Sequence, residues 1–408
     1  MVVFACQRDS FQKEFSTTVV SCRPSVLKTD DSKEEISCYE VVCEDTILFP
    51  EGGGQPYDLG EMNGVPVLKV LRRGTEAVHY VKQPLEEGAT VKQVVDWKRR
   101  LDHMQQHSGQ HLVTAIADSM LGYPTTSWWL GEDVSHIELD TNKLTQDEVD
   151  KLEEAVNEKI REALPVHATV LKDGDPALDS TRTRGLPKDH VGDVRIITIA
   201  TVEANMCCGT HVSNLAELQA IKLLGFEKGK KGKTNLLFLA GGRVLAHLDK
   251  MYKRELELNL LLKNGPDSHT MLVDKLIKSN KAVNKNLQNA LKDCASSEIT
   301  KFKALDPKPK FFYHCRKDAE MDYCNFFIRE FNDPEVLLLL AIGEGTEGHV
   351  VLHGPPTLLQ DVGPRIAEIL EGKGNGKGHR FQAKVKDLKA LPKAVKICEA
   401  ACSTAPTL

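Results

Sequence analysis

The sequence predicts an α+β protein with an N-terminal β-barrel, an α+β central domain, a helical connector and a small C-terminal α/β module. Short alternating apolar runs separated by turn residues occupy the first part of the chain. Helical periodicity begins at Asp96, and a long helical stretch after Arg243 separates two regions that contain strand-like runs. We therefore expect domains at 1–95, 96–242, 243–304 and 305–408.

The composition is that of a globular protein. Hydrophobic residues make up 41% and charged residues 27% of the 408 positions, and the longest apolar run is only Val336 to Ile342, too short to span a membrane. Gln7, Arg8 and Asp9 break the first apolar stretch, so we expect no secretory leader and a cytoplasmic protein. The 11 cysteines lack regular spacing, which favours core residues or metal ligands over disulfides.

The region 1–95 is expected to form a small β domain. The run "YEVVCEDTILF" (39–49) is typical of a strand, and Asn63-Gly64 before "VPVLKVL" is a strong hairpin pattern. A net charge of -5 argues against a surface that binds polyanions everywhere, although local basic patches remain compatible with it.

The central region begins with two helices. Asp96 is a candidate N-cap for a helix that Gly122 and Pro124 would end. Thr145 and Glu148 form a capping-box pattern before a second amphipathic helix. Strand-like runs follow at 166–170, 194–202 and 234–241, which indicates helices packed on a mostly antiparallel sheet.

From Arg243 to about Thr300 the pattern is helical, with a break at 264–267. The spacing of apolar residues around Asn280 fits either a short coiled coil or an ordinary amphipathic helix, so dimerisation through this segment or the C-terminal module is left open. After the linker 305–310 we expect an α/β module whose "EGKGNGKGHRFQAK" stretch (371–384) is a glycine and lysine loop.

Three histidines, His103, His107 and His111, stand four residues apart on the first central helix. Side chains at positions i and i+4 lie almost above one another, so neighbouring pairs can chelate one ion, but three histidines span about 12 Å of helix axis. We choose His107 and His111, because Ser108 and Gly109 between them permit close approach at the helix surface. An isolated HxxxH pair is common by chance.

A second group of donor atoms follows a predicted strand. Cys207 and His211 lie four residues apart in a loop, and together with His107 and His111 they would offer one thiolate and three imidazoles. That set suits tetrahedral Zn²⁺, one per chain. Cys208 competes with Cys207 as the ligand. Four protein ligands usually form a closed structural site, so catalysis would need a displaceable ligand or an expanded coordination shell.

The motifs "HSGQHL" and "CCGTHV", with "FPEGGGQPYDLG" upstream, resemble the editing domain of alanyl-tRNA synthetase and, more closely, the free-standing alanyl-tRNA editing proteins of the AlaX family in their long form. The resemblance covers almost the entire chain, and the C-terminal part is similar to the module that the synthetases share with long AlaX proteins. The family's ligands fall on His107, His111, Cys207 and His211. Its usual CGGTH is CCGTH here, which puts only the packing around Cys208 in doubt.

The resemblance implies an aminoacyl-tRNA hydrolase that removes serine, and secondarily glycine, from mischarged tRNA(Ala) in trans, at a zinc site. No ATP-binding motif is present, so editing without charging is expected. The residues do not decide whether zinc activates water or positions the substrate, and they identify no catalytic residue. Two alternatives remain: a zinc-stabilised, non-catalytic RNA-binding protein, and an editing enzyme for Ser-tRNA(Thr).

Residues that would contact the substrate lie beside the ligands. A site that rejects alanine must reward the serine hydroxyl with a hydrogen bond, and Ser108, Gln110 and Thr210 are candidate partners. The loop Gly52, Gly53, Gly54 and Gln55 would bring backbone amides to a phosphate or the terminal adenosine. Lysines at 228–233 and in the C-terminal loop are candidate contacts for tRNA phosphates.

Overall fold

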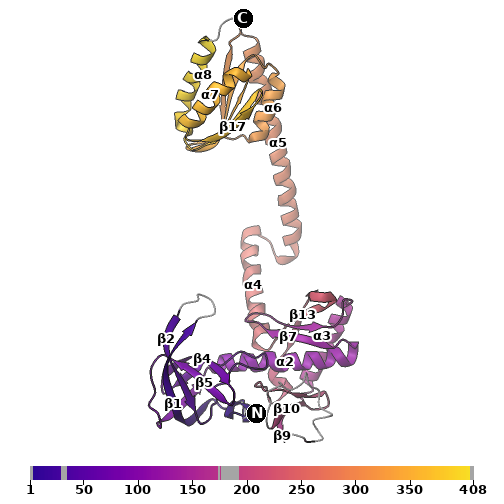
Figure 1. Ribbon diagram of the computed structural model, residues 1–408. Helices are drawn as coiled ribbons and strands as arrows, with labels where there is room; N and C mark the ends of the chain where they lie inside the picture. The colour runs from indigo at the N-terminus through magenta and orange to yellow at the C-terminus, as the bar shows by residue number, and fades with distance from the viewer. Residues whose placement is uncertain (1–2, 29–34, 173–174, 176–192, 405–408) are drawn as a thin grey trace. The chain divides into compact units, whose positions relative to one another are not determined.

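The computed structural model describes residues 3–28, 35–172, 175 and 193–404, and within this part the chain folds into two compact units, Met1–Glu257 and Leu258–Leu408. Both units combine helices with sheets, so the predicted α+β class is confirmed (Figure 1). No helix among the described residues is both long and apolar enough to cross a membrane.

The first unit opens with a short helix, α1 (Ala5–Arg8), followed by six strands that close on themselves in the order β1-β2-β5-β4-β3-β6. The first strand pairs with β2 on one side and with β6 on the other, and every pairing is antiparallel. The bounds are β1 (Glu14–Lys28), β2 (Glu35–Cys43), β3 (Gly60–Met62), β4 (Val65–Arg73), β5 (Glu76–Val81) and β6 (Thr90–Val95). The expected strand 39–49 is wrong beyond Cys43, where the chain leaves β2.

The helix α2 (Trp97–Leu121) carries the histidine pattern and has the predicted ends. The Asp96 side chain accepts a hydrogen bond from the backbone amide of Arg99, and Gly122 adopts a φ of 68° at the C-terminus. The second central helix, α3 (Gln146–Arg161), begins at the predicted Thr145–Glu148 capping box. Both helices bury apolar faces in one core with the central strands.

Two antiparallel sheets complete the first unit. One has the order β12-β13-β8-β7 and packs against α2, and the other has the order β11-β10-β9 (Figure 1). The bounds are β7 (Thr125–Leu130), β8 (Ser135–Leu139), β9 (Val166–Leu171), β10 (Val194–Ile199), β11 (Glu203–Met206), β12 (Ile221–Lys228) and β13 (Thr234–Ala240). The predicted strand 194–202 is too long, because Thr201 turns with a φ of 61° and the chain returns as β11.

The boundary between the units falls within α4 (Gly242–Leu262). The second unit contains a five-stranded sheet, β14-β15-β16-β18-β17, in which the first pair is parallel and the others antiparallel. The bounds are α5 (His269–Lys303), β14 (Phe311–Arg316), α6 (Met321–Phe331), β15 (Leu337–Glu344), β16 (Glu347–His353), α7 (Pro356–Ile369), β17 (Lys373–Lys377), β18 (Arg380–Val385) and α8 (Leu391–Thr404).

Helices cover both faces of this sheet. Alternate residues of β15 pack against α7 and α8 on one face, and the others pack against α6 and the end of α5 on the opposite face (Figure 1). The glycine and lysine stretch was expected to be a loop, and this expectation is wrong in part. Residues Lys373–Lys377 form the exposed edge strand β17, because their backbone pairs with β18 although their side chains bury nothing, and residues 380–384 belong to β18 itself.

Candidate metal centre

Four donor side chains from two distant segments meet in the first unit. The donor atoms of His107, His111, Cys207 and His211 all lie within 4.8 Å of one another. The sulfur of Cys207 is 3.2 Å from Nε2 of His211 and 3.4 Å from Nε2 of His107. The three imidazoles are buried and Cys207 is half-buried, so the group could hold a metal ion away from bulk water.

The local structure explains why these residues converge. His107 and His111 are one helical turn apart on α2, as their spacing predicts. Cys207 and His211 lie in the loop directly after β11, and Gly209 lets that loop approach the helix. A Cβ atom at Gly209 would lie 2.2 Å from Cε1 of His107, so no side chain fits there. His103 and Cys208 lie outside the cluster.

Each imidazole has a partner for its other nitrogen. Nδ1 of His107 lies 2.8 Å from the side-chain oxygen of Gln55, Nδ1 of His111 lies 3.1 Å from a carboxylate oxygen of Glu203, and Nδ1 of His211 lies 3.0 Å from the hydroxyl of Ser108. Such partners fix the ring orientation and place the Nε2 lone pair toward a shared centre, as is usual for histidine ligands.

The charge balance favours a thiolate at Cys207. Burial opposes ionisation, but the imidazoles of His107, His211 and His111 outweigh it and hold the pKa of the Cys207 thiol well below its usual value. Burial lowers the pKa of His211 well below its ordinary value, which keeps that ring neutral. Burial opposes protonation of His111, but Cys207 and Glu203 outweigh it and raise the pKa of His111 to about 10. Metal binding at this thiolate would therefore displace the proton of His111.

The backbone of the ligand loop is fixed by a buried arginine. Arg195 on β10 donates from Nη1 to the carbonyls of Cys207 and Gly209, at 2.9 and 2.8 Å, and from Nε to the carbonyl of Gln7. Gln7 in α1 in turn donates its side-chain amide to the carbonyl of Cys208. These bonds connect the N-terminal helix to the loop, so the position of Cys207 does not depend on a metal alone.

The glycine-rich loop lies against the same centre. The amide of Gln55 is wholly buried: its oxygen accepts from His107 and from the backbone amide of Thr210, and its nitrogen donates to the Thr210 hydroxyl at 2.8 Å. Gly53 and Gly54 have φ values of +57° and +80°, and a Cβ at Gly54 would lie 2.4 Å from the ring of Trp128. Gly53 and Gly54 remain exposed on their outer side.

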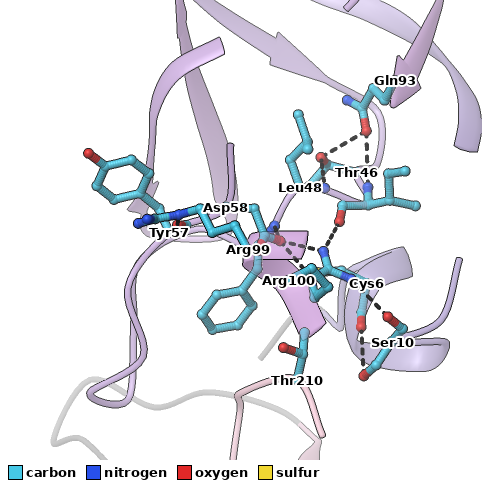
Figure 2. Close-up of polar contacts among 12 residues, drawn as sticks. Cys6, Ser10, Thr46, Leu48, Tyr57, Asp58, Gln93, Arg99, Arg100 and Thr210 are labelled. Carbon is cyan, nitrogen blue, oxygen red and sulfur yellow. Dashed lines mark hydrogen bonds and ion pairs between the residues drawn. The ribbon is translucent and has the colours of Figure 1, made fainter. Parts of the chain in front are cut away.

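A buried ion pair holds the start of α2 to the segment that precedes β3. Both side chains of Arg100 and Asp58 are fully buried, and Nε of Arg100 donates to Asp58 at 2.9 Å. Figure 2 shows the guanidinium of Arg100 between Asp58 and the backbone of Ser10, whose carbonyl accepts at 3.0 Å. The Ser10 hydroxyl accepts from the backbone amide of His211, so the ion pair and the ligand loop share one residue.

The predicted hydroxyl-binding candidates occupy different environments. Ser108 accepts from the backbone amide of Val212 at 3.1 Å besides facing His211, and Thr210 is engaged by Gln55. The Gln110 amide nitrogen donates to the Thr114 hydroxyl at 2.9 Å. Within the described part of the chain, no group pairs with the Gln110 side-chain oxygen, which is buried.

Comparison of the sequence with known proteins identifies one family. The family described as "Threonyl and Alanyl tRNA synthetase second additional domain" matches residues 194–236. The chain is 51% identical to Alanyl-tRNA editing protein Aarsd1-B of Xenopus laevis over 94% of both chains. It is 30% identical to the putative alanyl-tRNA editing protein alaX of Saccharomyces cerevisiae, over 93% of this chain and 92% of that protein. The chain belongs to the alanyl-tRNA editing protein family.

A solved structure, the C-Ala domain of alanyl-tRNA synthetase from Aquifex aeolicus, matches 23% of this alanyl-tRNA editing family member and 90% of that chain, with 17% identity and a TM-score of 0.21. The sequence interpretation missed Arg195, Glu203 and Gln7. All three lie outside the ligand motifs. Arg195 and Glu203 are lone charged residues on strands and Gln7 is a polar residue on a short helix, so no sequence pattern marks them as partners of a ligand or of the ligand loop.

Proposed function

We propose that the chain is a zinc-containing, trans-acting hydrolase that deacylates mischarged tRNA(Ala), chiefly seryl-tRNA and secondarily glycyl-tRNA. The observation that carries the proposal is the buried cluster of three histidines and Cys207, with each Nδ1 atom held by a partner, in a chain of this family. Membership of the alanyl-tRNA editing family supports tRNA(Ala) as the substrate, and the cluster of donor atoms supports a bound metal ion.

The donor set fits zinc. One thiolate and three imidazoles form a borderline-soft tetrahedral set, and the second nitrogen of each imidazole is already oriented. His107, His111, Cys207 and His211 would hold one ion per chain. When bound, Zn²⁺ supplies Lewis acidity toward an ester oxygen, which is the chemistry that an aminoacyl ester needs.

The protein's own residues would position the substrate. The aminoacyl ester is labile, so holding it in one orientation beside the cluster supplies much of the acceleration. Arg195 fixes the ligand loop, and Gln55 fixes the ring of His107. Gly53 and Gly54, which precede Gln55 in the glycine-rich loop, expose their backbone. We propose that the glycine-rich loop contacts the 3′ end of the tRNA.

Contacts farther from the cluster would bind the rest of the tRNA. Most lysines of the segment 228–233 are exposed at the β12–β13 turn, and those of β17 lie on an open sheet edge. Each phosphate they neutralise would make binding more salt-dependent. We propose that the segments 1–95, 96–242, 243–304 and 305–408 are functional domains. We also propose that the protein acts in the cytoplasm, where mischarged tRNA(Ala) occurs.

Release of serine from Ser-tRNA(Ala) by the full chain tests the proposal. We expect rapid release by the unaltered protein, and little release by Cys207→Ala and His111→Ala variants that remain folded and have lost the metal. Binding of the tRNA without release would indicate a non-catalytic RNA-binding protein. Faster release from Ser-tRNA(Thr) than from Ser-tRNA(Ala) would assign the other tRNA.

A dimer through α5 is a second proposal. It is supported by four exposed apolar residues on that helix, Val273, Leu276, Val283 and Leu287. A measurement of the mass in solution tests it.

A further inference from the structure

The buried glutamines of α2 differ in how completely their amides are used. Gln106 donates to the carbonyl of Ala240 and accepts from the amide of the same residue. Gln105 donates to the carbonyl of Glu217 and accepts from the amide of Gly242. Both side chains therefore connect α2 to neighbouring backbone. Such full pairing is expected, because an unpaired polar atom inside a protein is unfavourable.

Gln110 is the exception among these three. Its side chain is 4% exposed, its nitrogen donates to the Thr114 hydroxyl, and its oxygen has no partner in the described structure. Thr114 also accepts from Thr125 on β7, at 3.1 Å. If the amide is turned by 180°, Thr114 pairs with the oxygen and the nitrogen becomes the unpaired atom. In either orientation one buried polar atom is left for another group.

The Gln110 side chain lies on α2 next to one of the candidate ligands. Gln110 follows His107 by three residues, and side chains at that spacing are neighbours on a helix surface. The strand that carries Thr125 also carries Trp128, whose ring lies 5.1 Å from that of His107. Thr114, which binds the Gln110 amide, and His107 therefore both face β7.

The other hydroxyl-binding candidates are already engaged. The Ser108 hydroxyl faces Nδ1 of His211 and accepts from the backbone amide of Val212. The Thr210 hydroxyl accepts from Gln55, whose amide also holds His107. A substrate that used either hydroxyl would compete with bonds that orient a ligand. Gln110 can accept a new bond without that loss.

We propose that Gln110 is the specificity-determining residue of the site, and that its side-chain amide forms a hydrogen bond with the β-hydroxyl of the seryl group. This proposal rests on the proposed deacylase function. A seryl ester satisfies the buried amide, whereas an alanyl or glycyl ester leaves it unpaired. Sites that hydrogen-bond a substrate hydroxyl discriminate strongly against analogues that lack it.

The test compares two esters on one variant. Gln110→Met keeps the length of the side chain and removes the amide. We expect kcat/KM for Ser-tRNA(Ala) to fall roughly 10- to 100-fold, and kcat/KM for Gly-tRNA(Ala) to fall far less, because glycine never used the amide. Metal content and thermal midpoint are measured on the same preparation. An equal fall for both esters, or an unchanged rate with serine, overturns the role of Gln110.

The matched control is Gln106→Met, the same substitution four residues earlier at a glutamine whose amide pairs with the backbone of Ala240 and with the Asp102 carboxylate. It should lower stability and leave the ratio of the seryl to the glycyl rate as it was. If Gln110→Met does not fold, Gln110→Asn, whose shorter amide cannot reach the same point, must show the same selective loss. Absence of serine release by the unaltered protein overturns the deacylase function itself, which is a different result from an equal loss with both esters.

Discussion

At the scale of single residues, the candidate metal centre depends on side chains that are not themselves candidate ligands but bind the Nδ1 atoms of the three histidines. Glu203 lies 3.1 Å from Nδ1 of His111, and both side chains are almost completely buried. Gln55 and Ser108 have the same relation to His107 and His211. Partners of this kind raise the basicity of an imidazole ligand and restrict its rotation. They are therefore expected to affect metal affinity before they affect folding.

Glu203→Gln should weaken zinc binding about 10- to 100-fold, because the neutral amide stabilises the His111 ring less than a carboxylate does. Competition with a chromophoric chelator at neutral pH measures the affinity. Glu227→Gln on the exposed end of β12 is the control and should bind zinc as the unaltered protein does. Equal affinities for all three proteins would show that Glu203 does not tune the site.

Asp58→Asn should destabilise the first unit by about 3–5 kcal/mol, because it leaves the buried Arg100 without its counter-charge. Urea unfolding at neutral pH gives the free energy of unfolding. Asp147→Asn removes one partner of the exposed Lys151 pair and should change that free energy little. A small effect at Asp58 would mean that the carbonyls of Ser10 and Ile47 suffice to hold the guanidinium.

At the scale of elements, local patterns predicted the helices better than the strands. The ends of α2 and α3 follow from Asp96, Gly122 and the Thr145–Glu148 capping box, all of which act within one helical turn. The strand β17 was missed because its order comes from pairing with β18, a partner that its own glycines and lysines do not indicate. The turn at Thr201 lacks glycine or proline, so the break between β10 and β11 was also missed.

Strand β5 places His79 in the interior of the first unit, where its ring contacts the Thr46 hydroxyl and the Val41 carbonyl. Burial lowers the pKa of His79 to about 4, whereas an unfolded chain titrates near 6.5. The unfolded state therefore takes up the proton first as the pH falls. The stabilising contribution is complete above about pH 6.5 and is lost progressively toward pH 4.

His79→Gln should flatten this part of the stability curve, by roughly 1.4 kcal/mol per pH unit at most. Denaturant unfolding of the first-unit transition at several pH values between 7 and 4 measures the slope. The same substitution at exposed His167 is the control. If the slope survives in His79→Gln, the acid sensitivity of this unit comes from other groups, of which buried His103, with its pKa lowered to about 4, is the next to examine.

At the scale of the whole molecule, all four candidate ligands lie in the first of the two units. A metal bound to the folded state alone stabilises only the unit that contains it. Calorimetry of the full chain should show two transitions, and a strong chelator should lower the midpoint of one of them. In Cys207→Ala that transition should already be lowered and insensitive to chelator. A chelator that shifted both transitions equally would show that the units unfold together.

The sequence was sufficient to bring His107, His111, Cys207 and His211 forward, because their spacings are short and their chemistry is distinctive. It was insufficient for Gln55, which was expected to face substrate and instead has its amide buried between His107 and Thr210. Spacing along the chain does not reveal which way an amide points when its partners lie some 50 and 155 residues away.

The two bonds made by the oxygen of Gln55 link the glycine-rich turn mechanically to the metal-binding helix and to the cysteine loop. A substrate that displaced the turn would move the Gln55 amide, whose oxygen accepts a hydrogen bond from Nδ1 of His107 and so determines the tautomer of that ring. Substrate binding and the tautomer of His107 are therefore coupled. Conversely, loss of the metal ion would free His107 and weaken the hydrogen bonds that hold the glycine-rich turn, which is the proposed contact for the end of the tRNA.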